Sequence, residues 1–208
     1  MVQSSVERER LIQDLLHAAR VLRDSGCLPA TDGNLSARLA HDRALVTIRG
    51  IEKRNLTEWD FVEVPVAEAS PADTSTEWGL HRALYLNRAE VECILHVHSP
   101  ALTSFAAAHT VPAVELLAEA FMTIGEIALV PFAKPGTPRL ADLLLAANPK
   151  AMVYLLSNHG AVAVGSSVRE TLHRLERAEF LARVQIDASA LGGPKPLTAD
   201  QLADLATH

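Results

Sequence analysis

Three histidines of the sequence are spaced as ligands of a single metal ion could be. His96 and His98 stand one residue apart in the apolar run ILHVHSPALTS, residues 94–104. Alternate side chains of a strand point to the same face, so these two imidazoles are expected to project together, with Cα atoms about 7 Å apart. His159 ends a second extended run, and the turn residue Gly160 beside it could aim its ring into the same cavity. Three neutral imidazoles with an open fourth position are a catalytic zinc arrangement.

Glu77 strengthens the metal hypothesis. It stands in TSTEWG, where an extended segment turns into a helix. A carboxylate beside a divalent ion can be a fourth ligand or can transfer a proton. Two structural alternatives stay open: Glu77 as a first-turn helix acid favoured by the dipole, and His96 and His98 as satisfied side chains of a core strand. The spacing of the two histidines alone favours the second alternative.

Three glycine- or hydroxyl-rich turns could bind an anion. TDGNLSAR, TIRGIEK and TSTE each offer backbone N–H groups, small residues or hydroxyls, and the last lies at a predicted helix N-terminus. Each turn alone is weak support, but beside a metal they describe a site for a small phosphorylated substrate. The predicted phosphate-binding residues are Gly33, Asn34, Arg49, Gly50, Ser75 and Thr76.

The elements that must position these residues read as one α/β domain over residues 1–208. A helical pattern covers residues 4–26, and strand-like segments follow at residues 34–40, 43–50 and 60–66, as in a meander. From residue 75 onward helical and extended patterns alternate, and a last long helical pattern covers residues 167–191. Such alternation predicts a sheet with helices packed on it.

Composition excludes several classes of function. The formal net charge is -6, which argues against a nucleic-acid partner. Cys27 and Cys93 stand far apart and outside any CxxC pattern, so they are expected to be reduced core thiols. No secretory signal or membrane-spanning stretch is recognisable, which predicts a soluble, cytoplasmic protein with no membrane partner.

The order of the motifs resembles a known family. The sequence presents GN-S-R at residues 33–38, T-x-x-G at 47–50, S-[ST]-E at 75–77, H-x-H-S at 96–99 and N-H-G at 158–160. This order resembles the class II aldolase/adducin family, most closely its bacterial L-fuculose-phosphate-aldolase-like members. The resemblance implies a three-layer α/β/α fold around a mainly antiparallel sheet. It also implies a fourfold-symmetric homotetramer with active sites at the subunit contacts.

The resemblance also implies roles for individual residues. His96, His98 and His159 would hold Zn²⁺, for which Mn²⁺ or Co²⁺ could substitute, and Glu77 would be a resting ligand and the catalytic acid/base. The three turns would cradle the phosphate of a sugar. Two positions depart from the family pattern: Arg49 replaces a small hydroxyl residue, and Leu116 aligns with a tyrosine that fuculose-phosphate enzymes lend to a neighbouring subunit.

The leading functional hypothesis is aldol cleavage of a ketose 1-phosphate to dihydroxyacetone phosphate and an aldehyde. Relatives of the family also dehydrate methylthioribulose 1-phosphate, decarboxylate an oxo-tetronate phosphate or epimerise a pentulose phosphate. Glu77 speaks against the decarboxylases, which tend to carry lysine there, and the additional acid/base residues of the epimerases are not recognisable. A dehydratase and a non-fuculose aldolase therefore stay open. A metal-free scaffold, as in adducin, is the alternative from another class of function.

Overall fold

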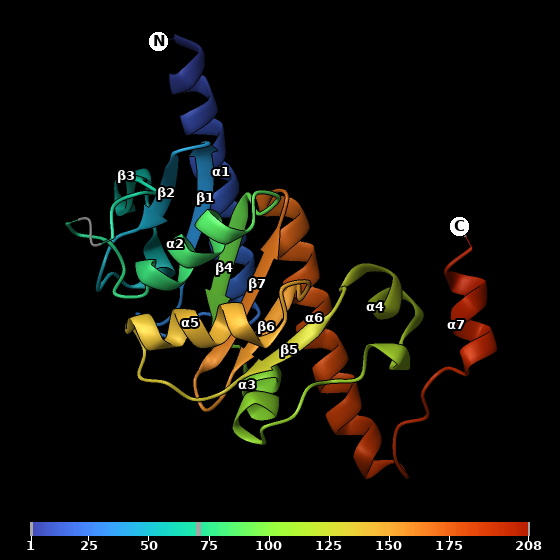
Figure 1. Cartoon of the computed structure of the whole chain (residues 1–208). Helices are drawn as coiled ribbons and strands as arrows, with labels where there is room; N and C mark the ends of the chain where they lie inside the picture. Colours follow the sequence, from blue (N-terminus) through green and yellow to red (C-terminus); the bar gives the residue numbers. More distant parts are fainter. Residues whose placement is uncertain (1, 70–71, 208) are drawn as a thin grey trace.

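Helices and strands alternate along the chain, and the computed structural model describes residues 2–69 and 72–207 (Figure 1). The helices are α1 Val2–Asp24, α2 Trp78–Asn87, α3 Pro100–Ala107, α4 Ala118–Thr123, α5 Pro138–Ala147, α6 Val168–Ala190 and α7 Ala199–Leu205. The strands are β1 Asn34–Ala40, β2 Arg43–Thr47, β3 Phe61–Pro65, β4 Cys93–Val97, β5 Ile127–Val130, β6 Val153–Leu156 and β7 Gly160–Gly165. Short 3-10 helices are η1 Lys53–Asn55, η2 Glu58–Asp60 and η3 Val114–Leu116.

The strands form one mainly antiparallel sheet, as the family resemblance implied. Their order is β3-β2-β1-β4-β7-β6-β5. The predicted meander is β1, β2 and β3, and all neighbouring strands pair antiparallel except β5 and β6, which are parallel. Two segments from distant parts of the chain, β4 and β7, lie side by side at the centre. This pairing brings the His96 region and the His159 region together.

Helices cover both faces of the sheet, which confirms the three-layer α/β/α fold. In Figure 1, α2 and α5 lie in front of the sheet and α6 lies behind it. One hydrophobic cluster packs α1, α3 and α6 against the sheet, and a second packs α2 and α5 against the other face. Both clusters are rich in Leu, Val, Ile and Ala, and the expected core thiols Cys27 and Cys93 are buried and unpaired.

Strand alternation decides which layer the candidate site belongs to. Leu95 and Val97 of β4 join the α1/α3/α6 cluster, whereas Ile94 joins the α2/α5 cluster. His96 alternates with Leu95 and Val97 and therefore points toward the α2 side of the sheet. Asn34, on the neighbouring β1, is paired with His96 across the strands. The N-terminus of α2, where Glu77 stands, is on that same side.

Sequence patterns located most element ends within a few residues. The last long helix is α6, whose N-cap Ser167 accepts a hydrogen bond from the Glu170 N–H. The first helix ends at Asp24, and Gly26 follows with φ 77°. The predicted strand over residues 43–50 ends earlier, at Thr47. Within the described residues, no helix is both long and apolar enough to cross a membrane.

Candidate metal centre

The three histidines converge from two neighbouring strands. His96 is the fourth residue of β4, and His98 follows the strand directly, so the expectation that both lie within the strand is wrong by one residue. His159 ends the turn between β6 and β7, in which Asn158 has φ 57°. The ring centroids lie 4.9 to 5.1 Å apart, and one ligand nitrogen from each ring lies within 4.8 Å of the others. The predicted common cavity is thus formed.

Polar contacts on the far side of two rings turn their Nε2 atoms toward the site. His96 Nδ1–H donates to the Ala161 carbonyl at 3.0 Å, and His98 Nδ1 lies 3.3 Å from Asp32 Oδ2. Each outer contact keeps a proton on Nδ1, so Nε2 is the nitrogen that can bind a cation once it has no proton. The two Nε2 atoms face each other at 3.3 Å. Two lone pairs at that distance repel unless a proton or a metal ion lies between them.

Glu77 completes the donor set. It is the N-cap residue of α2, but its side chain makes no capping hydrogen bond and turns toward the histidines. Its Oε2 lies 3.0 Å from His96 Nε2, and its Oε1 lies 3.6 Å from His159 Nε2. The Asn34 amide donates to Oε2 at 3.0 Å and so holds the carboxylate in place. Glu77 therefore does not act as a helix-capping acid, because its carboxylate contacts the histidines and not the N–H groups of α2.

The charges of the site suit a cation. Burial raises the pKa of Glu77, but the charge and hydrogen bond of His96, with His159 and the Asn34 amide, together outweigh burial and hold that pKa well below its usual range. Burial and the neighbouring His96 lower the pKa of His159 to about 4. Burial opposes protonation of His96 as well, yet Glu77 raises the pKa of that ring. Binding of a divalent ion would displace the proton that His96 shares with Glu77.

The residues present fit a divalent metal. Glu77 Oε1 and His159 Nδ1 are buried and have no hydrogen-bond partner among the described residues. A buried carboxylate oxygen without a partner is costly unless a cation or substrate meets it. Three imidazoles with one carboxylate match a catalytic zinc site, and such donors also bind Mn²⁺ or Co²⁺.

A polar cavity of about 320 Å³ opens onto the histidines. Nine of the ten predicted site residues line it, and the tenth, His96, is buried just behind them. The lining residues also include Thr31, Asp32 and Lys53. The nine are Gly33, Asn34, Arg49, Gly50, Ser75, Thr76, Glu77, His98 and His159. The three predicted anion turns therefore share one cavity with the histidines.

The anion turns differ in what their side chains do. The Asn34 amide donates one hydrogen bond to Glu77, so this side chain holds the carboxylate. The Ser75 hydroxyl accepts from the Glu77 N–H at 3.3 Å. Arg49 is exposed at the rim, and its backbone N–H donates to the Asp73 carbonyl. Their contact with a phosphate stays a prediction.

Two glycines are required because nothing larger fits. A Cβ at Gly33 would lie 2.6 Å from the His96 carbonyl oxygen, and its φ is 76°. A Cβ at Gly160 would lie 2.5 Å from the Val97 carbonyl oxygen and 2.8 Å from the His98 ring. Both glycines let another strand approach the histidines closely.

Sequence reasoning missed Asp32 as the outer partner of His98. Its only signal is its place immediately before the Gly33 turn. It also did not foresee how Lys53 is held: the ammonium group donates to the carbonyls of Thr31 and Ile51 at 3.2 and 3.1 Å, and burial lowers its pKa. Leu116, by contrast, packs against the α1/α3/α6 cluster of its own chain.

Comparison with known proteins places the chain in a family. The family profile described as "Class II Aldolase and Adducin N-terminal domain" matches residues 13–186. A methylthioribulose-1-phosphate dehydratase of Xanthomonas campestris pv. campestris is 32% identical, over 92% of this chain and 95% of that protein. A 5-methylthioribulose-1-phosphate/5-deoxyribulose-1-phosphate aldolase of Escherichia coli is 28% identical, over 94% of this chain and 92% of that protein.

The solved structure of an L-fuculose 1-phosphate aldolase from Glaciozyma antarctica has the same fold. Its TM-score is 0.83 at 22% identity, with coverage of 97% of this chain and 82% of that chain. The chain belongs to the class II aldolase/adducin family, as its motif order indicated. The named relatives are lyases that act on small sugar phosphates.

Proposed function

We propose that this protein is a metal-dependent lyase that dehydrates methylthioribulose 1-phosphate or a similar ketose 1-phosphate. The observation that carries the proposal is the convergence of three imidazoles and Glu77 at one polar cavity. The dehydratase relative supports this reaction better than the fuculose-type cleavage expected above. At 22% identity, the likeness to fuculose aldolase extends to the fold alone.

His96, His98, His159 and Glu77 would hold the ion, with Zn²⁺ the first expectation and Mn²⁺ or Co²⁺ able to substitute. When bound, the ion would act as a Lewis acid that polarises the substrate ketone. The protein contributes the orientation of the rings through Ala161 and Asp32. Such outer partners fix the tautomer of a ligand histidine.

Glu77 would be the acid/base group. The C3–H bond of a 2-ketose is acidic because it adjoins the carbonyl, and Glu77 Oε1 is buried without a protein partner and available to take this proton. The C4–O bond then breaks, and the C4 hydroxyl leaves as water with the proton that Glu77 returns. The enol that remains becomes a diketone when its hydroxyl proton moves to carbon.

The phosphate of the substrate would lie in the turn-lined part of the cavity. Gly33, Gly50, Ser75 and Thr76 offer backbone N–H groups and hydroxyls there, and the cations Arg49 and Lys53 also line the cavity. Backbone N–H groups and charged donors together are the usual recognition elements for a phosphate dianion.

Product analysis tests the proposal. Purified protein loaded with zinc is mixed with methylthioribulose 1-phosphate, and products are followed by mass spectrometry. Dehydration gives a single product lighter by one water, with no broken carbon–carbon bond. Metal-loaded protein that leaves this substrate unchanged, while converting another sugar phosphate, would reject the assigned substrate.

Aldol cleavage is the second candidate, favoured by the Escherichia coli relative that is named as an aldolase of the same kind of sugar phosphate. Cleavage would release dihydroxyacetone phosphate in the same assay. Leu116 counts against it, because an apolar side chain cannot protonate the departing aldehyde oxygen. Protein that binds no metal and converts no substrate would favour the scaffold alternative.

We also propose that residues 1–208 act as one domain within a cytoplasmic homotetramer. The single sheet, to which both halves of the chain contribute, supports the one-domain assignment. Light scattering of the purified protein measures the oligomeric state, and a monomeric mass at micromolar concentration would reject the tetramer.

A further inference from the structure

A polar seam runs between α2 and β1, inside an otherwise apolar layer. On the helix side the seam has every fourth residue: Glu77, His81 and Tyr85. On β1 it has every second residue: Asn34, Ser36 and Arg38. Asn34 bonds Glu77 at 3.0 Å, and Ser36 Oγ lies 2.7 Å from His81 Nδ1 and 2.7 Å from Tyr85 Oη. These five residues are between 0% and 7% exposed, so the seam is a buried network.

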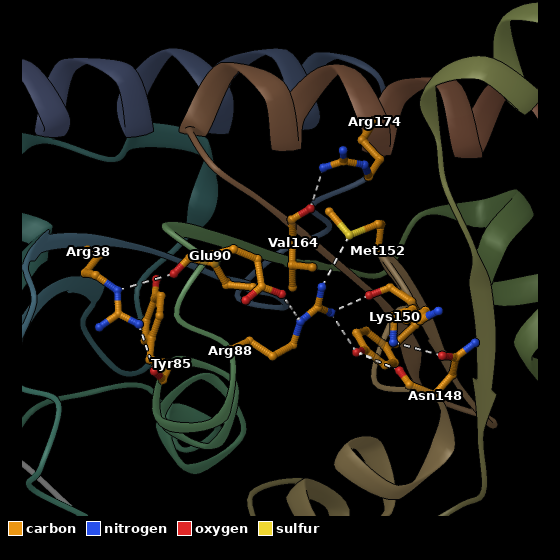
Figure 2. A network of polar contacts seen from close by, with 12 residues as sticks. Arg38, Tyr85, Arg88, Glu90, Asn148, Lys150, Met152, Val164 and Arg174 are labelled. Atoms are coloured by element: carbon orange, nitrogen blue, oxygen red, sulfur yellow. Dashed lines mark hydrogen bonds and ion pairs between the residues drawn. The ribbon is translucent and has the colours of Figure 1, made fainter. Parts of the chain in front are cut away.

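Arg38 closes the seam at its far end. Its guanidinium stacks over the Tyr85 ring at 4.7 Å from the centroid, and Nη2 donates to the Tyr85 carbonyl at 2.8 Å. Figure 2 shows this contact, which is separate from the neighbouring network around Arg88. The three pairs, or rungs, are thus Asn34 with Glu77, Ser36 with His81, and Arg38 with Tyr85.

Regular geometry explains why the rungs stay aligned. Four residues advance a helix by about 6 Å, and two residues advance a strand by about 6.7 Å. Helix and strand therefore bring a new facing pair together at each step. A shift of α2 by one residue along β1 would break every rung at once.

The hydrogens of the central rung can be assigned. Burial raises the pKa of Tyr85 well above 10 and lowers the pKa of His81 to about 3, so the phenol keeps its proton and the ring is neutral. Both hydroxyl protons find an acceptor if Tyr85 donates to Ser36 and Ser36 donates to His81 Nδ1. In either direction the buried His81 Nε2 has no partner among the described residues, and the reverse direction also leaves the Tyr85 proton without an acceptor.

Stability alone does not account for this seam. Apolar side chains of similar volume would fill the same space without the desolvation that buried hydroxyls and imidazoles suffer. What the polar contacts add is a fixed register between α2 and β1. The register matters at the first rung, because Asn34 is the cross-strand partner of His96 and also holds the Glu77 carboxylate.

We propose that Ser36, His81 and Tyr85 are positioning residues that lock α2 against β1 and thereby hold the Glu77 carboxylate at the three histidines. The inference rests on the proposed metal centre. It predicts that removing a distant hydroxyl of the seam weakens metal binding, although that hydroxyl contacts no ligand.

Titration of the ion-free protein with Co²⁺ tests this, read by visible absorption. Ser36→Ala and Tyr85→Phe should each weaken binding about tenfold, at the low end for outer partners of a metal site. Their absorption should also change, because a displaced Glu77 alters the coordination number of Co²⁺. His81→Leu should behave likewise, whereas His81→Asn, with an amide near the position of Nδ1, should recover most of the affinity.

Tyr154→Phe is the matched control. Tyr154 is buried in the same layer, and its hydroxyl accepts a hydrogen bond from Arg88 at 3.0 Å, but it belongs to no rung of the seam. Its Co²⁺ affinity and spectrum should match the wild type, even where thermal unfolding shows a comparable loss of stability. If the seam variants bind Co²⁺ as tightly as Tyr154→Phe, the inference is overturned but the metal centre is not. Wild-type protein that binds no Co²⁺ overturns the metal centre and the inference together.

Discussion

At the scale of single residues, Glu77 is the group whose chemistry should be separable from its role as a ligand. Glu77→Gln keeps the size and an oxygen for the ion but cannot accept a proton. Turnover is expected to fall about 10²- to 10⁴-fold, the usual share of a general acid/base, while zinc stays bound. Steady-state kinetics with metal analysis measure both, and Glu176→Gln, an exposed change on α6, is the control. Undiminished turnover in Glu77→Gln would remove it from the mechanism.

Gly160 offers a second test at this scale. Gly160→Ala places a methyl group against the Val97 carbonyl and the His98 ring, so we expect about 1–3 kcal/mol lower stability and weaker zinc binding. Gly79→Ala, in α2 with no atom within 4 Å of the added Cβ, should instead be neutral or slightly stabilising. Chemical denaturation measures the free energy of unfolding of both variants. Equal stabilities would show that the β4–β7 contact adjusts freely.

Residue identity was the most predictable part of the site. The types and order of His96, His98, His159 and Glu77 were sufficient to propose a shared cavity. Asp32 was not predictable, because its role depends on where the His98 ring points after β4 has ended. The side-chain bond from Asn34 to Glu77 was equally hidden, since it joins residues far apart in sequence.

At the scale of elements, a carboxylate on α6 fixes the start of α3, the helix that follows His98. Both carboxylate oxygens of Glu179, on α6, accept backbone N–H groups at the start of α3, from Ala101 and Leu102, each at 3.0 Å. Glu179→Gln has one acceptor oxygen in place of two and sets an NH₂ group against a buried N–H. We expect a loss of about 1–3 kcal/mol in the free energy of unfolding. Urea denaturation measures it.

The control for Glu179→Gln is again Glu176→Gln, which lies on the same helix and is exposed. A surface substitution of this kind should change stability by less than about 0.5 kcal/mol. If the two variants unfold at the same urea concentration, the Glu179 carboxylate is dispensable for α3.

Element types were predictable where a periodic pattern was long. The helix over residues 167–191 and the strand over residues 34–40 match α6 and β1 closely. Local irregularity was not predictable: within residues 114–125, Leu117 is extended, with φ −134° and ψ 132°, and separates η3 from α4. The parallel pairing of β5 with β6 also has no local signal.

At the scale of the whole molecule, the buried histidines make stability depend on pH. The pKa values of His81 and His159 are lowered to about 3 and about 4, against about 6.5 in an unfolded chain. As pH falls from about 6.5 to about 5, these two histidines bind protons in the unfolded chain but not in the folded chain, so the free energy of unfolding decreases. His96, whose pKa Glu77 raises, is protonated first in the folded chain and so offsets part of this loss near pH 6.5, whereas Glu77, whose pKa is lowered, stays charged in the folded chain.

Urea denaturation of ion-free protein at several pH values measures this dependence. His81→Asn removes one of the lowered histidines, so its stability should decrease less steeply over the same interval. A wild-type stability that is constant between about pH 6.5 and pH 5 would contradict the buried, neutral state of these rings.

The unequal steps of helix and strand along the seam also limit its length. Each rung adds a mismatch of about 0.7 Å between α2 and β1, which reaches roughly 1.4 Å at the third rung and would exceed hydrogen-bonding tolerance soon after. Both elements stop near that point: α2 ends two residues beyond Tyr85, and β1 ends two residues beyond Arg38. Both elements therefore end near the point at which their two periodicities fall out of phase.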